Sequence, residues 1–113
     1  MLLPNAQSAV IDPAKLRDYL LSRTHPIGRF KARFFAALGF SADRWVELEG
    51  ALRSQHLTQD GVLTDSGPHG QAYAIQAILA GPGGQSAPVV SIWFIRVGEQ
   101  HPRFVTAYPG EAK

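Results

Sequence analysis

The sequence predicts an α+β domain in which about three helices precede an antiparallel meander of three to four strands. Apolar residues recur at helical spacing through residues 12–57. Residues 71–109 are instead rich in β-branched and aromatic side chains, with short Gly- and Pro-containing turns between the apolar runs. A chain of 113 residues is the size of one domain, so we treat residues 1–113 as a single domain in which a loop over 58–70 joins the two halves.

Three helices are expected, over residues of about 13–23, 27–38 and 42–57. Asp12 can accept hydrogen bonds from the first amides of the first helix, and Pro13 fits its first turn because the missing N–H costs nothing there. Gly39 is placed to end the second helix in a left-handed conformation. Ser41 is expected to cap the third helix with its side chain.

Lys31 has an unusual position on the second predicted helix. The apolar stripe expected to face the core is formed by Ile27, Phe30, Phe34 and Leu38. At 100° per residue Lys31 falls about 40° from Ile27, within that stripe, whereas Arg29 and Arg33 fall at about 200° and 240° and point away. An ammonium group there must extend to solvent, pair with a carboxylate or line a site, and extension to solvent is the commonest outcome.

The second half predicts strands over residues 71–80, 89–97 and 103–108, with a short strand possible at 61–64 inside the connecting loop. Residues 89–97 are apolar on both faces, which predicts a strand covered on both sides. On the last strand, alternation predicts Phe104, Thr106 and Tyr108 on one face, with Arg103 and Val105 on the other.

Composition excludes several kinds of site. The chain has no cysteine, which excludes a disulfide framework, a thiol nucleophile and any Cys-ligated metal. The four histidines lack zinc-ligand spacing, and His56 lies on an apolar stripe as a core or rim residue. We therefore expect no metal and no cofactor. No leader and no apolar run of membrane-spanning length is found, so we expect no membrane association and a location in a bacterial-type cytoplasm.

Charge is distributed unevenly along the chain. The formal net charge is only +2, yet residues 14–33 carry six basic residues against one acidic residue, a local balance of +5. Residues 41–65 carry two basic against five acidic residues, a balance of −3. A basic cluster of this kind can bind phosphates, although charge runs are more often solvated helix faces.

Several short motifs together resemble a small bacterial family, domain of unknown function family 6883. The motifs cover residues 1–6, 15–19, 25–32, 70–73 and 102–108, with Phe35 and Trp93. This resemblance spans most of the chain and implies no established activity. A weaker likeness, carried by His-Pro-x-Gly-x-x-Lys-Ala-x-x-Phe before a strand meander, is to toxin domains of the barnase/EndoU/colicin/RelE type. Those domains are metal-independent ribonucleases that work with basic and hydroxyl residues.

The toxin likeness and the basic N-terminal half lead to one hypothesis, cleavage of RNA through its ribose 2′-hydroxyl. His25 would act as general acid or base, Lys31 and Arg103 would offset charge on the phosphate, and Thr106 and Tyr108 would position it or donate a proton. The residues that would contact the substrate are Arg29, Arg33, Tyr73, Trp93 and Arg96.

A second hypothesis belongs to a different class, a non-catalytic binding module such as the immunity or antitoxin component of a two-protein system. It rests on the charge segregation and on aromatic residues expected at the surface, which are Trp45, Tyr73, Trp93 and Tyr108. An enzyme for a small anionic substrate would use the same residues as the ribonuclease. The predicted partners are therefore RNA or a cognate protein, and the sequence does not indicate the oligomeric state.

Overall fold

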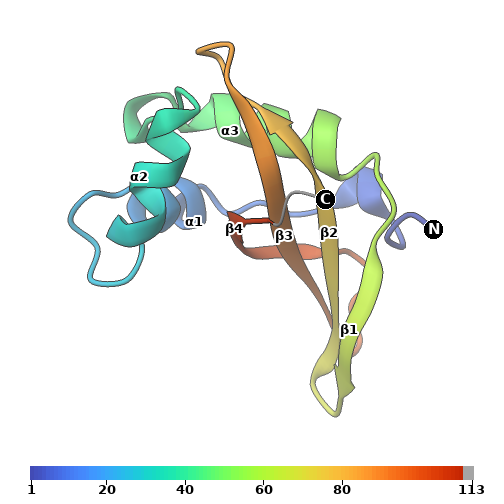
Figure 1. The fold of residues 1–113 in the computed structure, drawn as a ribbon. Helices are drawn as coiled ribbons and strands as arrows, with labels where there is room; N and C mark the ends of the chain where they lie inside the picture. Colours follow the sequence, from blue (N-terminus) through green and yellow to red (C-terminus); the bar gives the residue numbers. More distant parts are fainter. Residues whose placement is uncertain (111–113) are drawn as a thin grey trace.

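The computed structural model describes residues 1–110 and confirms the predicted α+β architecture (Figure 1). Four antiparallel strands form one sheet in the order β1-β2-β3-β4. Their bounds are β1 Val62–Gly67, β2 Gly70–Ala80, β3 Ser86–Arg96 and β4 Arg103–Pro109. The segment expected as a loop over 58–70 contains β1, which lies further along the chain than the short strand suggested at 61–64 and pairs with β2 through Val62 opposite Ala74 and Gly67 opposite Gly70.

The helical half consists of short segments joined end to end. Helix α1, Pro13–Lys15, continues as a π-helical turn over Leu16–Leu20, and α3, Trp45–Ala51, continues in the same way over Leu52–His56. Between them lies the separate helix α2, Arg29–Ala37. The shorter 3-10 segments are Ala6–Ser8 and Ala42–Arg44. The three helices thus fall within the predicted ranges, and each is shorter than or differently wound from a plain α-helix.

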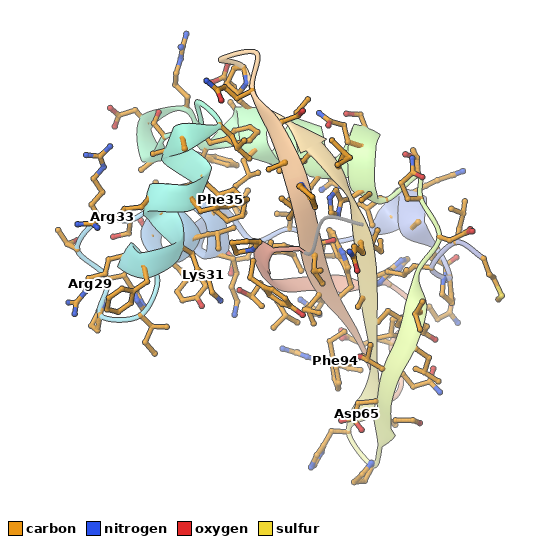
Figure 2. The ribbon with its side chains drawn as sticks, viewed as in Figure 1. Arg29, Lys31, Arg33, Phe35, Asp65 and Phe94 are labelled. Carbon is orange, nitrogen blue, oxygen red and sulfur yellow. The ribbon has the colours of Figure 1, made fainter. Side chains whose placement is uncertain are left out.

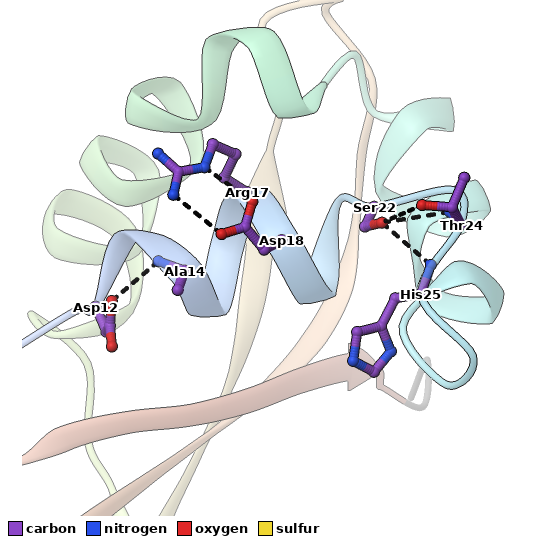
Figure 3. A network of polar contacts seen from close by, with 7 residues as sticks. All are labelled: Asp12, Ala14, Arg17, Asp18, Ser22, Thr24 and His25. Carbon is purple, nitrogen blue, oxygen red and sulfur yellow. Dashed lines mark hydrogen bonds and ion pairs between the residues drawn. The ribbon is translucent and has the colours of Figure 1, made fainter.

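Two of the predicted helix-end signals are observed and one is not. Oδ1 of Asp12 accepts from the amide of Ala14 at 3.0 Å (Figure 3). Gly39 has φ +96°, the left-handed conformation expected after α2. Ser41 makes no side-chain capping bond, because the third helix begins with a 3-10 turn in which the amide of Arg44 donates to the backbone oxygen of Ser41 at 3.1 Å.

The core lies between the helices and one face of the sheet. Its buried members on the strands are Ile75, Leu79, Val89, Trp93, Phe104 and Ala107, and on the helices they include Leu16, Leu20, Phe35, Leu48 and Leu52. In Figure 1, α3 crosses one side of β2 and β3, and α1 and α2 lie beside β4. The opposite face of β3 carries Val90, Ile92 and Phe94, which are only partly buried. The expectation that residues 89–97 are covered on both sides is met only in part, because the core buries one face of the strand and leaves the other partly exposed.

The buried face of α2 differs from the predicted apolar stripe. Ile27 and Phe30 are 63% and 68% exposed, whereas Ala32 and Phe35 are buried. Small residues explain the shift, because a Cβ on Gly28 would lie only 1.9 Å from the backbone oxygen of Tyr19. The helix approaches its neighbour through its smallest residues, so the large apolar residues at its N-terminal end remain outside.

A β-bulge in β4 changes which residues share a face. Thr106 pairs with Ile92 and Phe104 pairs with Trp93, so Val105 is an extra residue in the strand. Phe104 and Ala107 are both buried as a result, and Thr106 lies on the other face. The prediction that Phe104 shares a face with Thr106 is therefore wrong, because strict alternation fails at a bulge.

Candidate functional site

Lys31 is the centre of a polar cluster that joins three elements. Its Nζ donates to the hydroxyl oxygen of Tyr19 at 3.0 Å and to Oγ1 of Thr106 at 2.8 Å. Tyr19 comes from the π-helical turn after α1, Lys31 from α2 and Thr106 from β4. The ammonium is partly buried, and residues 1–110 give it no carboxylate partner. Two of its three N–H groups are used by hydroxyls, which leaves one for an anion.

The same contacts change the acidity of Tyr19. The hydrogen bond from Lys31 lowers the pKa of the Tyr19 hydroxyl, and a weaker hydrogen bond from Thr106 acts in the same direction against desolvation. The ammonium also lies 5.4 Å from the centroid of the Tyr19 ring. Both effects stabilise the phenolate relative to an isolated tyrosine. The cluster therefore pairs an available cation with an oxygen that gives up its proton more readily than usual.

His25 lies at the rim of this cluster and shapes the start of α2. Its Nδ1 accepts from the amides of Ile27 and Gly28, both at 3.0 Å, and its own amide donates to Oγ of Ser22 (Figure 3). Its ring packs edge-on against Tyr19 with centroids 4.9 Å apart. Because Nδ1 is an acceptor, the neutral ring carries its proton on Nε2. In that form His25 can donate a hydrogen bond from Nε2.

The approach of α2 to Tyr19 depends on Gly28. A Cβ at this position would lie 1.9 Å from the backbone oxygen of Tyr19 and 2.7 Å from its carbonyl carbon. Such contacts are far inside van der Waals distance, so any side chain there would push α2 away. Since Lys31 is less than one turn further along, the distance between Lys31 and Tyr19 depends on this glycine.

Two more of the predicted site residues lie on β4. Tyr108 is 39% exposed and pairs with Val90, two residues beyond Thr106 on the same face of the strand. Arg103 lies before the bulge, opposite Phe94, and makes a bidentate ion pair with Glu99 at 3.0 and 2.8 Å. Hydrogen bonding from Arg103 lowers the pKa of Glu99. The structure therefore brings Thr106 to Lys31, places Tyr108 on the same strand face as Thr106, and engages Arg103 in an ion pair with Glu99.

Arg96 belongs to the Arg103 region as well. Its Nε lies 3.9 Å from Glu99, and both arginines line a hollow of about 360 Å³ together with Lys15 and Phe94. Two carboxylates, Asp12 in the lining and Glu99 beside it, reduce the positive charge there. This hollow is a weaker anion site than the number of its basic residues indicates.

Arg29 and Arg33 lie on the opposite side of α2 from Lys31. Figure 2 shows both side chains pointing away from the sheet, whereas Lys31 and Phe35 point toward it. Together with Arg23 they line a hollow of about 650 Å³. The predicted substrate contacts of Arg29 and Arg33 would therefore lie on a second surface and not in the Lys31 cluster.

Trp93 cannot contact a substrate or a partner, because it is completely buried. Its Nε1 donates to Oγ of Ser91 at 2.9 Å, and Ser91 in turn lies 2.7 Å from Nδ1 of His56. All three residues have 0% exposure, and desolvation lowers the pKa of His56 to about 4. The predictions that Trp93 is exposed and binds substrate are wrong, while His56 is a core residue as expected. Tyr73 is partly buried and donates to Gln71 at 2.9 Å.

Sequence reasoning does not single out Tyr19. Its spacing with Leu16 and Leu20 is that of an apolar stripe, which places the residue with the core. A tyrosine on such a stripe still needs a partner for its hydroxyl, and a lysine on a neighbouring apolar stripe is a candidate for one. The need of both residues for a polar partner is the sequence signal that could have identified Tyr19 as a site residue beside Lys31.

Within residues 1–110 no group of three His, Asp or Glu side chains is arranged to hold a metal ion. Over the same residues, no helix combines the length and apolar character needed to cross a membrane.

The fold and the cluster define a small α+β domain with helices before a four-stranded meander and a lysine–hydroxyl site at their junction. The chain belongs to the family described as Domain of unknown function (DUF6883), whose family model matches residues 2–111. No curated protein matches the sequence. Among solved structures, a chain from the contact-dependent growth inhibition toxin–immunity protein complex of Klebsiella pneumoniae 342 has a similar fold, with a TM-score of 0.62 at 18% identity. The match covers 90% of this chain and 100% of that chain.

Proposed function

We propose that this protein is a toxin-type ribonuclease of a two-protein system, and that it cleaves RNA without a metal ion at the Lys31 cluster. The observation that carries the proposal is a partly buried ammonium held by two hydroxyls, with no carboxylate among the described residues to neutralise it. A desolvated cation of this kind favours an anion, and the phosphate of a scissile bond supplies one.

In this proposal the cluster and Tyr108, two residues beyond Thr106 on the same strand face, supply the groups that the reaction needs. Tyr19 acts in its deprotonated form, which the hydrogen bond from Lys31 favours: its phenolate oxygen takes the proton of the ribose 2′-hydroxyl and becomes the phenol as the 2′-oxygen attacks the adjacent phosphorus. The third N–H of Lys31 binds a non-bridging oxygen of the phosphate. Tyr108, exposed on the same face of β4 as Thr106, gives its proton to the departing 5′-oxygen. The products are a 2′,3′-cyclic phosphate and a free 5′-hydroxyl, and solvent returns both tyrosines to their starting states.

His25 and Thr106 act as positioning residues in this proposal. Thr106 accepts from Lys31 and so fixes the direction of the ammonium. His25 holds the first turn of α2 through two backbone amides and packs its ring against Tyr19. Family membership and the toxin–immunity complex of similar fold support a toxin-system role at the level of the fold alone. A bacterial cytoplasm, where RNA is accessible, is the expected place of action.

The test compares purified wild type, Lys31→Met and the control Arg44→Met on a single-stranded oligoribonucleotide with EDTA present. Arg44 is an exposed basic residue outside the cluster, so its loss changes the charge equally. We expect wild type and control to cleave and to leave cyclic phosphate ends, and Lys31→Met to be about 100-fold slower or worse. Intact RNA with the wild type, or equal cleavage by Lys31→Met, would contradict the proposal.

A second candidate function is the non-catalytic partner in a two-protein system. The arginine-lined hollow on the far side of α2 favours it, because that surface offers charge without any catalytic hydroxyl cluster. The same experiment separates the two functions. A purified wild type that is folded, leaves RNA intact and does not slow growth on expression would favour the binding role.

A further inference from the structure

The arginine face is the surface formed by Arg23, Arg29, Phe30 and Arg33, which line a hollow of about 650 Å³ together with Ala36 and Ala37. None of its three guanidinium groups forms an ion pair with a carboxylate of residues 1–110. Each of the other five arginines has such a partner, as in Arg53 with Glu49 at 3.0 Å. The face therefore concentrates positive charge that the described part of the protein does not neutralise.

Apolar surface is exposed in the middle of this charge. Phe30 is 68% exposed, and the guanidinium carbon of Arg29 lies 4.7 Å from its ring centroid. Ile27, one turn before it, is 63% exposed. An isolated exposed apolar residue is ordinary, but a phenylalanine surrounded by unpaired arginines has the composition of an interface centre, where aromatic residues and arginine are enriched.

The arginine face and the Lys31 cluster lie on opposite sides of the same helix. Arg29 and Arg33 are two residues before and after Lys31, so an α-helix turns both about 160° away from it. Figure 2 shows this divergence, with the two arginines directed outward and Lys31 directed toward the sheet. A strand of RNA bound at Lys31 would have to bend around the helix to reach the arginines. The arginine face is thus poorly placed to extend the Lys31 site.

We infer that the arginine face is a docking surface for an acidic protein partner whose contact region combines carboxylates with apolar side chains. The carboxylates would pair with Arg23, Arg29 and Arg33, and an apolar side chain would cover Phe30. The inference does not depend on RNA cleavage. It also predicts that the partner binds while the Lys31 cluster stays open to solvent.

A peptide of about a dozen residues that alternates Glu with Leu serves as the probe, with an all-Glu peptide and an oligouridylate of equal length beside it. Each is titrated into the ¹⁵N-labelled full chain, and the amide signals of α2 and the Nε–H signals of the arginines are followed by NMR. We expect the Glu–Leu peptide to bind most tightly and to shift the signals of Arg29, Phe30 and Arg33. Phe30→Ala should weaken the Glu–Leu peptide and leave binding of the all-Glu peptide unchanged.

The decisive variant is Arg29→Glu/Arg33→Glu, in which both changes are at exposed sites and a carboxylate in the first turn of α2 would suit the positive end of the helix dipole. Its affinity for the Glu–Leu peptide should fall about tenfold or more. The matched control is Lys15→Glu/Arg44→Glu, which changes the net charge equally at exposed positions outside the hollow. The control should retain most of the affinity.

Four outcomes would overturn the inference. Tighter binding of the oligouridylate, lost in the same double variant, would assign the face to nucleic acid. Equal loss in the control would mean that only net charge matters. Equal binding of the two peptides with no effect of Phe30→Ala would remove the apolar part of the surface. Finally, an absence of shifts at Arg29, Phe30 and Arg33 would show that acidic protein segments do not dock there.

Discussion

Two three-residue polar networks in this protein are built from similar groups and differ in their burial. His56, Ser91 and Trp93 form one network inside the core, where each residue is completely buried. Lys31, Tyr19 and Thr106 form the other at the junction of α2, the π-helical turn and β4, where each is only partly buried. In each network a titratable nitrogen lies within hydrogen-bond distance of a hydroxyl oxygen. Nδ1 of His56 is 2.7 Å from Oγ of Ser91, and Nζ of Lys31 is 2.8 Å from Oγ1 of Thr106.

Burial decides what each network can do. Inside the core, desolvation lowers the pKa of His56 to about 4, so the imidazole stays neutral and Ser91 has no access to solvent. At the junction, the ammonium of Lys31 keeps one free N–H and the pKa of Tyr19 is lowered. A serine beside a histidine is therefore a structural pair here, whereas a lysine beside two hydroxyls is the candidate site. Residue types alone would have favoured the serine–histidine pair over the lysine–hydroxyl cluster as the candidate catalytic site.

The largest expected effect comes from removing the buried base. His56→Ala leaves a cavity in the core and removes the partner of the Ser91 hydroxyl, so the free energy of unfolding should fall by about 3 kcal/mol or more. Urea denaturation followed by tryptophan fluorescence measures this loss. A decrease below about 1 kcal/mol would mean that the core network contributes little to stability.

Acid should weaken the fold through the same residue. Burial lowers the pKa of His56 to about 4 in the folded protein, against about 6.5 for an unperturbed histidine, so between these pH values the unfolded chain binds a proton that the folded protein does not. The stability that this histidine contributes is present above pH 6.5 and falls as the pH drops toward 4, by about 2 kcal/mol between pH 7 and pH 5. Comparison of denaturation curves at the two pH values with those of His56→Gln isolates the effect. An identical pH dependence in His56→Gln would exclude His56 as its source.

A smaller effect is expected when the donor at the other end of the network is lost. Trp93→Phe removes the Nε1–H that donates to Ser91 and leaves some empty volume, which should cost about 1–2 kcal/mol. The protein should still fold, with Phe104 packing against the new ring as it does against Trp93. Thermal unfolding by circular dichroism provides the measurement, and Trp45→Phe at a partly buried position is the matched control.

The smallest effect on stability is expected at the junction. Lys31→Met keeps the length of the side chain and loses two hydrogen bonds of a partly buried group, so the free energy of unfolding should change by no more than about 1 kcal/mol. RNA cleavage, in contrast, should fall about 100-fold. A large loss of stability without loss of cleavage would reverse the comparison and make the junction the structural network.

Local signals in the sequence predicted the order of elements well. Asp12 and Gly39 were correctly predicted at helix ends because the effects of these residues depend on neighbouring residues alone. The buried face of α2 was not predictable from the size of Ile27 and Phe30, since it depends on how closely the helix approaches Tyr19. That contact is tertiary, so the helical periodicity of the sequence does not indicate it.

The candidate site was predictable in part for the same reason. Lys31 stood out because a charge on an apolar stripe is costly, and Thr106 was named with it; the structure brings the two within 2.8 Å. Trp93 was misjudged because an apolar strand does not reveal which of its faces is covered. Arg103 was assigned with Lys31 to the phosphate because of its charge; the bulge at Val105 places it on the same strand face as Thr106, opposite Phe94, but its ion pair with Glu99 engages the guanidinium.

Gly28 gives a criterion for recognising other chains that share this site. The close approach that it permits leaves no room for a methyl group, because the nearest atom to a Cβ would be a backbone oxygen that cannot rotate away. A homologous sequence with a larger residue at this position must hold α2 further from the preceding helix. Such a chain could retain Tyr19, Lys31 and Thr106 in its sequence and still lack the contacts between them. When genomes are searched for further members that carry the lysine–hydroxyl cluster, the glycine is therefore as informative as the polar residues.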